Sequence, residues 1–219
     1  MKIALSPENA SPAPPDAEMY PEDVSLAARR AALIKTDYDA IPFELRERRQ
    51  WVGMSLEWRI TEAGYKFHKQ PKRPDSGMNA DTSDPQSCSG FDDAVAARER
   101  YHFDGIGYVA TADDPCAFVV LDDCIDKRSG VVAPEVMDVV RWFSSYTERS
   151  CSGTGLHVVV RGKVPGPRNR GQLHGFGVAM YESGQYMVMT GSRLSLSGTT
   201  QISDAQPALD ELYASLFGR

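Results

Sequence analysis

The stretch FVVLDDCID, residues 118–126, has the pattern of a buried strand that ends in a group of carboxylates. Four apolar residues come first, and Asp122, Asp123 and Asp126 follow them closely. Carboxylate oxygens are hard ligands that suit Mg²⁺ or Mn²⁺, so strands of this kind often hold a metal ion. Side chains two residues apart share one face of a strand, so the residue that would join Asp122 is at position 120. That residue is Val120.

The composition is that of an ordinary globular protein. The chain has 219 residues, of which 42% are apolar and 25% charged, and these values allow a substantial core. It contains no apolar run long enough for a membrane span and no secretory signal, so we expect no membrane association. Its four cysteines lack CxxC spacing, which predicts neither a disulfide framework nor a zinc site and favours a reducing cytoplasm.

The pattern of turns and apolar spacing divides the chain into an extension, 1–40, and a domain, 41–219. The extension is rich in proline and is predicted to be flexible, with a short helix in 21–35. Within the domain we expect strands at 50–60, 105–111, 116–123 and 156–162, a hairpin formed by 177–183 and 185–191, and helices at 91–101, 133–146 and 203–217. Residues 65–90 are predicted to be a long loop. The elements follow no regular βαβ rhythm, which predicts an α+β fold with a mixed or mostly antiparallel sheet.

A second motif, ERSCSGTGLHVVV (148–160), is a loop of small residues that leads into a strand. Ser150, Ser152, Gly153 and Gly155 would let backbone amides and hydroxyls approach a phosphate closely, as anion-binding nests do. His157 would then donate a hydrogen bond to that phosphate. The loop is not a Walker motif, because no Gly-Lys-Ser/Thr follows it. A tight turn before a buried strand is the alternative interpretation.

Two basic segments, KFHKQPKRP (66–74) and RGKVPGPRNR (161–170), depart from the net charge of −6. Solvated loops are the alternative for both, but basic side chains on phosphates and aromatic faces for stacking are also what nucleic-acid binding needs. Trp51, Trp58 and Tyr186 are the stacking candidates. For Trp51 and Trp58, which lie on a predicted strand, a place in the core is the preferred interpretation. The basic candidates are Lys69 for a nucleotide phosphate and, for nucleic acid, Lys72, Arg73, Arg161, Arg168 and Arg170.

Taken together and in this order, the motifs resemble the archaeo-eukaryotic primase superfamily, in particular the primase-polymerase domains of phages and plasmids. The resemblance covers roughly residues 41–195. It rests on IPFELRERRQWVGMSLEW, KQPKRPDSGMNADTSDPQSCSGFDDAV, DGIGYVAT, LDDCID, ERSCSGTGLH and YESGQYMVMTG. It implies a two-part α+β core related to the RNA-recognition fold. It also implies that the protein binds a template strand and a nucleoside triphosphate, and that three carboxylates hold two divalent metals.

The sequence departs from that family at the metal site. The resemblance places the three carboxylates at positions 120, 122 and 179, and here they are Val120, Asp122 and Ala179. The basic residue that follows the turn in the family is Gln185 here, and the lysine often found in the small-residue loop is Thr154. Only Asp122 is left as a ligand, so the site is predicted to be degenerate and to hold Mg²⁺ or Mn²⁺ weakly or not at all.

A replacement site built from Asp122, Asp126 and Glu182 is an alternative, but it requires a bulge in the strand. The catalytic candidates are therefore Asp122 and His157.

The leading prediction is a catalytically impaired primase-polymerase-like protein of a phage or mobile-element replication system. It would bind single-stranded or primer-template DNA, a nucleoside triphosphate, or both. One alternative is an active template-dependent primase-polymerase with an atypical metal site. Another is a protein that regulates a replication helicase or initiator, with the helix in 21–35 as a docking element.

Overall fold

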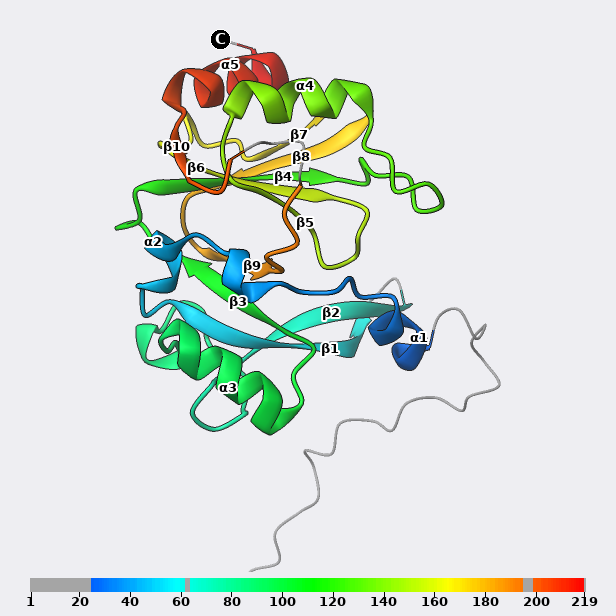
Figure 1. Ribbon diagram of the computed structural model, residues 1–219, viewed down its shortest axis with the longest axis vertical. Coiled ribbons are helices and arrows are strands. Elements are labelled where there is room, and N and C mark those ends of the chain that lie inside the picture. The colour runs from blue at the N-terminus through cyan, green and yellow to red at the C-terminus, as the bar shows by residue number, and fades with distance from the viewer. Residues whose placement is uncertain (1–24, 62–63, 195–198, 219) are drawn as a thin grey trace, which may run out of the picture.

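The computed structural model describes residues 25–61, 64–194 and 199–218 as two β-sheets that share a core, with two helices covering the outer side of the second sheet (Figure 1). Sheet A has the strand order β2 (Gly64–Lys72), β1 (Trp51–Thr61), β3 (Gly105–Ala110) and β9 (Gln185–Met189). Sheet B has the order β10 (Ser203–Asp204), β6 (Leu156–Arg161), β4 (Cys116–Asp122), β8 (Phe176–Tyr181) and β7 (Arg170–Leu173), with β5 (Thr147–Arg149) also on β6. All pairs are antiparallel except β10 with β6. The predicted α+β class is confirmed.

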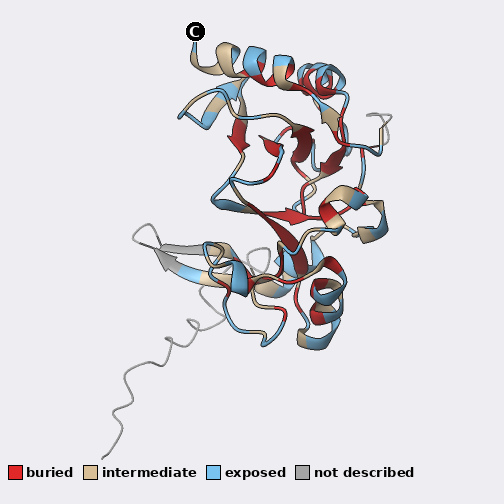
Figure 2. Ribbon diagram, turned by 90° about the vertical axis from the view of Figure 1, so that its left-hand side faces the viewer, coloured by how far each residue is buried: buried red, intermediate tan, exposed pale blue. Residues whose placement is uncertain are grey.

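The strand β4 separates two hydrophobic clusters, because its side chains alternate between the faces of sheet B. Ala117, Val119 and Leu121 belong to the cluster under α4 (Pro134–Phe143) and α5 (Gln206–Phe217). Phe118 and Val120 belong to the cluster between the two sheets. The strand predicted at 116–123 is therefore buried on both faces (Figure 2).

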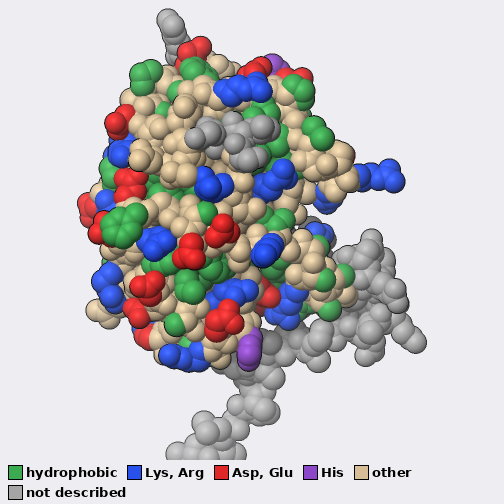
Figure 3. Space-filling view, viewed as in Figure 1, with side chains coloured by type: hydrophobic (Ala, Val, Ile, Leu, Met, Phe, Trp, Pro, Cys, Tyr) green, Lys and Arg blue, Asp and Glu red, His purple; other side chains and the backbone are tan. Residues whose placement is uncertain are grey.

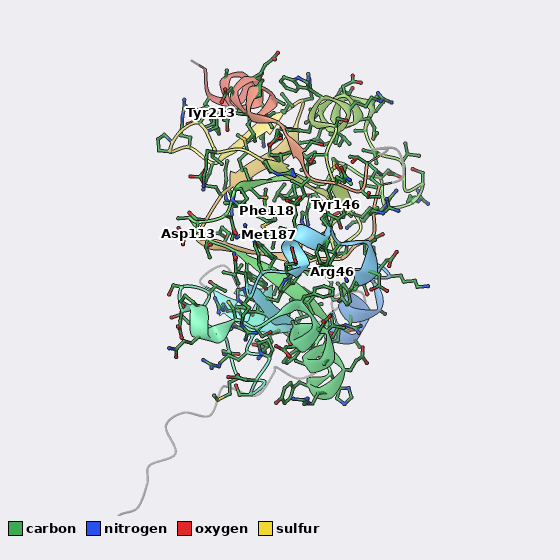
Figure 4. All side chains as sticks on the ribbon, turned by 60° about the vertical axis from the view of Figure 1, so that its left-hand side comes forward. Arg46, Asp113, Phe118, Tyr146, Met187 and Tyr213 are labelled. Carbon is green, nitrogen blue, oxygen red and sulfur yellow. The ribbon has the colours of Figure 1, made fainter. Side chains whose placement is uncertain are left out.

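Aromatic side chains fill most of the space between the sheets. Trp51 and Tyr108 from sheet A are fully buried, with ring centroids 5.3 Å apart, and Phe118 and Tyr146 meet them from the side of sheet B. Figure 4 shows Phe118, Tyr146 and Met187 converging between the two sheets. The prediction that Trp51 is a core residue is confirmed.

The remaining helices lie around sheet A or at the chain's start. The helix α3 (Phe91–Tyr101) contacts β1 and β3, and α2 (Phe43–Arg46) precedes β1. Short 3-10 turns occupy Tyr38–Ala40 and Pro85–Ser87. None of the helices in the described part of the chain has the length and hydrophobicity that a membrane crossing requires.

The helix expected in 21–35 is present as α1 (Leu26–Ala31), and Ser25 caps it. Residues 1–24, with the predicted flexible extension, lie outside the described residues. The α1 helix packs on its own domain, because Arg30 Nε lies 2.9 Å from Asp104 Oδ1, and Leu26 and Leu33 contact the cluster around Met54. Leu26 of the helix and Leu33, which follows it, therefore pack within the chain.

The hairpin predicted for residues 177–191 is wrong. The strand β8 pairs with β4 and β7 in sheet B, whereas β9 pairs with β3 in sheet A. The turn around Gly184, which has a φ of +70°, carries the chain from one sheet to the other. The same happens between β3 and β4, and the Gly184 amide donates to the Ala110 carbonyl across the two crossings. Alternating apolar residues identified both strands, but alternation does not specify the partner strand.

The loop predicted for 65–90 is wrong in its first part. Residues Gly64–Lys72 form β2, paired with β1 from Gly53↔Lys72 to Thr61↔Gly64. The lysines and Pro71 in this segment favoured the prediction of a loop. Both are compatible with the edge of a sheet, where charges prevent further pairing and the missing proline donor is tolerated.

A buried carboxylate fixes the connection between the two sheets. Asp114, which is 1% exposed, follows β3 in the turn to β4. It accepts hydrogen bonds from Tyr108 Oη at 3.0 Å, Gln50 Nε2 at 2.8 Å and the Thr111 amide at 2.9 Å. The Arg48 guanidinium is 3.1 Å away. Burial, with the nearby Asp114 charge, raises the pKa of Tyr108, so the phenol stays protonated as the donor.

We expect Asp114→Ala to lower the free energy of unfolding by about 3 kcal/mol, because it leaves a buried network without its acceptor. Tyr108→Phe removes one hydrogen bond and should cost about 1 kcal/mol. Urea denaturation of both variants measures the difference. Equal losses would show that Asp114 does not organise the connection.

Candidate functional site

The candidate site is a row of side chains on the face of sheet B that looks toward sheet A. Val120 is directly opposite His157 on β6 and Ala179 on β8. Further along the row, His157 is opposite Glu148 on β5, and Ala179 is opposite Arg170 on β7. Residues directly opposite each other in antiparallel pairs point to the same face. The positions where the family resemblance implies metal carboxylates are therefore neighbours in space.

The residues present do not fit a two-metal centre. Asp122 is exposed at the end of β4, opposite Gly177, while Val120 and Ala179 offer only methyl groups. Across the described ranges 25–61, 64–194 and 199–218, no group of three His, Cys, Asp or Glu side chains is arranged to hold a metal. Two ions about 4 Å apart need several shared oxygen ligands, which this row lacks.

The alternative metal site formed by Asp122, Asp126 and Glu182 is not assembled. Asp126 accepts hydrogen bonds from the Ser129 amide at 2.7 Å and from Ser129 Oγ at 2.8 Å, which hold the pKa of its carboxyl below the ordinary value. Glu182 accepts from the Val164 amide at 2.8 Å. The β4–β8 register puts Tyr181 opposite Phe118, four residues or about 13 Å from the Asp122 end. The strand also remains regular up to Asp122, without the bulge that this site required.

The small-residue loop closes tightly against the end of β4. Ser150 Oγ accepts from the Gly155 amide at 3.1 Å and lies 3.0 Å from Ser152 Oγ, which in turn is 3.0 Å from Thr154 Oγ1. A side chain at Gly155 would put its Cβ 2.6 Å from the Leu121 carbonyl oxygen, so glycine is required for this approach. Gly153 has a φ of +75°. The loop thus brings hydroxyls and backbone amides beside Asp122.

Two successive amides of this loop are left for solvent or a ligand. Within the part of the chain that the structure describes, the N–H groups of Cys151 and Ser152 donate to no protein acceptor. Successive free amides in a glycine-containing turn form the concave arrangement that binds phosphate and other anions. Cys151 packs with Met54 and Val188, so the loop contacts sheet A as well.

Sequence reasoning missed Glu148, whose side chain is fully buried beside His157. Glu148 Oε1 lies 3.2 Å from His157 Nδ1. The sequence did carry a signal for this contact. If the loop at residues 150–155 joins two antiparallel strands, counting outward from both ends places residue 148 opposite residue 157.

The basic candidates of the segment around β2 differ in availability. Lys72 is paired with Glu57 and Asn79, and Arg73 forms two hydrogen bonds with Asp75, at 3.1 and 2.7 Å. The hydrogen bond from Arg73 lowers the pKa of Asp75 to about 2. Both cations are therefore partly neutralised inside the protein.

Lys69 lies in a different environment from the paired cations. It is exposed and directly opposite Leu56, which packs in the cluster that contains Cys151 of the small-residue loop. Lys69 and the loop therefore lie on the same side of sheet A.

The second basic segment contains two available arginines. Arg161 lies 3.6 Å from Glu44 and also donates to the Ile202 carbonyl. Arg168 and Arg170 are exposed, with their guanidinium carbons over the rings of Phe217 at 4.7 Å and Tyr181 at 5.7 Å. Lys and Arg side chains are interspersed with Asp and Glu side chains over the face shown in Figure 3, so no single-sign patch dominates that face.

The aromatic candidates are engaged in packing. Trp58 stacks on Phe67 with centroids 3.9 Å apart, where β1 and β2 extend past the rest of sheet A. The Tyr186 hydroxyl donates to the Lys69 carbonyl, and burial raises the pKa of Tyr186. Gln185, at the start of β9, is exposed opposite Ala110.

Comparison with known proteins gives one informative relative, while no protein-family model matches the chain. The DNA primase-polymerase of Nitratiruptor phage NrS-1 is 36% identical over 152 residues. The matched stretch covers 68% of this chain but only 20% of the relative, so the chain spans about a fifth of that protein's length. With the motif order and the two-sheet α+β fold, this identity shows that the chain belongs to the primase-polymerase family.

Proposed function

We propose that this chain is a primase-polymerase-type replication domain that binds a nucleotide through its phosphates but does not transfer nucleotides efficiently. The observation that carries the proposal is the row on sheet B. His157 and the adjoining loop are intact, while the two neighbours across β4 and β8 are Val120 and Ala179.

Phosphate binding is supported by the chemistry of the loop and by its surroundings. The free amides of Cys151 and Ser152 and the linked hydroxyls belong to the loop that joins β5, which carries Glu148, to β6, which carries His157. Hydrogen bonds to a charged phosphate contribute about 1.5–3 kcal/mol each, so a few are enough for micromolar binding. Lys69, exposed on sheet A, supplies a charge in this proposal.

The weak catalysis follows from the apolar pair. Nucleotidyl transfer by two metals lowers the pKa of the attacking hydroxyl and offsets charge on the leaving pyrophosphate. Losing several kcal/mol of that stabilisation slows the reaction by several powers of ten. The side chains of Val120 and Ala179 also have no polar atom, so they cannot bind a metal ion through an intervening water molecule.

The first test is triphosphate binding measured by calorimetry in the presence of EDTA. We expect binding to persist without divalent metal and His157→Ala to weaken it about tenfold or more, the value of one charge-assisted hydrogen bond. His102→Asn is the matched control. His102 lies at the C-terminal end of α3 with a φ of +56°, a conformation that Asn tolerates. Triphosphate binding that requires metal, or an affinity that His157→Ala leaves unchanged, would contradict the proposal.

The second test restores the carboxylates. Because positions 120 and 179 are directly opposite each other, Val120→Asp with Ala179→Glu places two acids in the row near Asp122. We expect this double variant to gain Mn²⁺ binding in calorimetry and primer extension in a gel assay, and Asp122→Ala to remove both gains. Val120→Asn with Ala179→Gln is the neutral control of the same shape.

The same assay separates the alternative of an active enzyme. Mn²⁺-dependent primer extension by the unaltered chain, lost in Asp122→Ala, would show that the site works without the other two carboxylates. The proposal of weak catalysis would then be wrong.

A second binding activity, toward single-stranded DNA, is favoured by Arg168 and Arg170. Both are exposed, and neither forms an ion pair with an acid in the described residues. Arg170 also lies at one end of the row, opposite Ala179.

We expect Arg168→Ala and Arg170→Ala each to weaken DNA binding and to reduce the slope of log affinity against log salt by about 0.7. Lys72→Ala and Arg73→Ala are the controls, since their charges are already paired with Glu57 and Asp75. Fluorescence anisotropy of a labelled oligonucleotide between 50 and 200 mM salt, a range of about fourfold, gives the slopes. Equal effects of all four substitutions would mean that the pairing does not decide the surface used.

A further inference from the structure

We infer that Glu148 is a positioning residue, which holds the His157 imidazole so that its Nε2 is presented to a phosphate oxygen of the bound nucleotide. The inference rests on the proposed phosphate binding and adds to it the group that sets the donor's orientation. It comes from the hydrogen bonds around a carboxylate that no motif identified.

Glu148 is surrounded by donors. Its side chain is 0% exposed and accepts from the Gly191 amide at 2.8 Å, the Thr190 amide at 3.1 Å and Tyr146 Oη at 2.8 Å. His157 Nδ1 is the remaining partner, at 3.2 Å. Burying a carboxylate is costly unless it is hydrogen-bonded, and here the surrounding donors offset that cost.

The backbone after β9 is shaped to serve this carboxylate. Gly191 has a φ of +66°, and a Cβ on it would lie 1.7 Å from the Asp37 carbonyl oxygen. The glycine lets the chain turn so that two successive amides point at Glu148. Burial, with the Glu148 charge second, raises the pKa of Tyr146, which keeps that hydroxyl protonated as a third donor.

These contacts determine which imidazole nitrogen donates to Glu148. The carboxylate already accepts from three other donors, so we assign His157 Nδ1 as the N–H that donates to it. Nε2 donates to a phosphate oxygen when it carries a proton as well, so the phosphate-bound ring has an N–H toward each acid. The second nitrogen, Nε2, makes no hydrogen bond with the described residues, and the side chain is 7% exposed. A histidine whose ring is fixed through one nitrogen presents the other to a ligand in a set direction, as metal-binding histidines do.

The register puts the imidazole where that direction is useful. His157 is opposite Glu148 on one side and Val120 on the other, so its ring lies between the buried acid and the apolar pair. The small-residue loop connects β5 to β6, and His157 is the second residue of β6 after that loop. The proposed phosphate site on the free amides of Cys151 and Ser152 is therefore a few residues along the chain from the ring.

The test is a double-mutant cycle on triphosphate affinity with Glu148→Gln and His157→Ala. A glutamine oxygen still accepts hydrogen bonds, but its NH₂ only donates and cannot accept from Gly191, Thr190 or Tyr146, so the side chain reorients. We expect Glu148→Gln alone to weaken binding about tenfold, and to have no further effect in the His157→Ala background. Tyr146→Phe is the control, because it removes one donor to Glu148 while leaving the contact with His157; it should lower the melting temperature without changing affinity.

A second measurement observes the imidazole directly. Nitrogen-15 NMR reports which ring nitrogens carry protons, and we expect a proton on Nδ1 of His157 in the unaltered protein and loss of that fixed state in Glu148→Gln. With triphosphate bound, Nε2 should carry a proton too, because it donates to the phosphate. A His157 ring without a proton on Nδ1 in the unaltered protein would overturn the inference, even if the variant fails to fold.

The outcomes separate this inference from the proposed function. If the unaltered protein binds no triphosphate, the proposed function fails, and the claim that Glu148 presents Nε2 to a nucleotide phosphate fails with it. In that case NMR judges only whether Glu148 fixes the ring. If triphosphate binds and depends on His157, but Glu148→Gln leaves affinity unchanged, the proposed function stands and the inference is wrong. Equal losses on Glu148→Gln with and without His157 would assign Glu148 a structural role, which also contradicts it.

Discussion

The antiparallel register of β4 with β6 and β8 is the constraint on which the rest of this molecule depends. It sends Ala117, Val119 and Leu121 under the helices and turns Phe118 and Val120 toward sheet A. A slip by one residue would exchange the two sets and expose the core, so the register is strongly fixed by burial. The same register brings His157 and Ala179 to either side of Val120. Fold and site are therefore two results of one pairing.

Much of the fold follows from local pattern, and the failures have a common cause. The strand at β4 and the helices α3, α4 and α5 have strong periodicity and turn signals, and the sequence predicts them well. The assignment of β8 and β9 to different sheets depends on Asp114 and the paired crossings, which are long-range contacts. The strand β2 was hidden because an edge position tolerates the lysines and proline that usually mark a loop.

The site divides in the same way. Positions 120, 122, 157 and 179, which the resemblance singled out, lie in one region of sheet B, because strand alternation and order along the chain carry that information. It did not identify Glu148, whose importance comes from donors on three other segments: Tyr146, Thr190 and Gly191. Nor did basic composition distinguish Arg170, which is exposed, from Arg73, which is held by Asp75. Ion pairing depends on which acids the fold brings near.

The direct contact between Val120 and Ala179 has a consequence for how such a site changes over time. Ala179 is buried and Val120 half-buried, so an acid kept at one position while the other is apolar would carry a desolvated charge with no ion to offset it. The state with both acids and the state with neither are each consistent, while either intermediate is penalised. Loss of the first carboxylate therefore favours loss of the second, and a return needs two simultaneous substitutions. The pairing of these two strands therefore makes each single substitution back to an acid unfavourable as long as the opposite residue stays apolar.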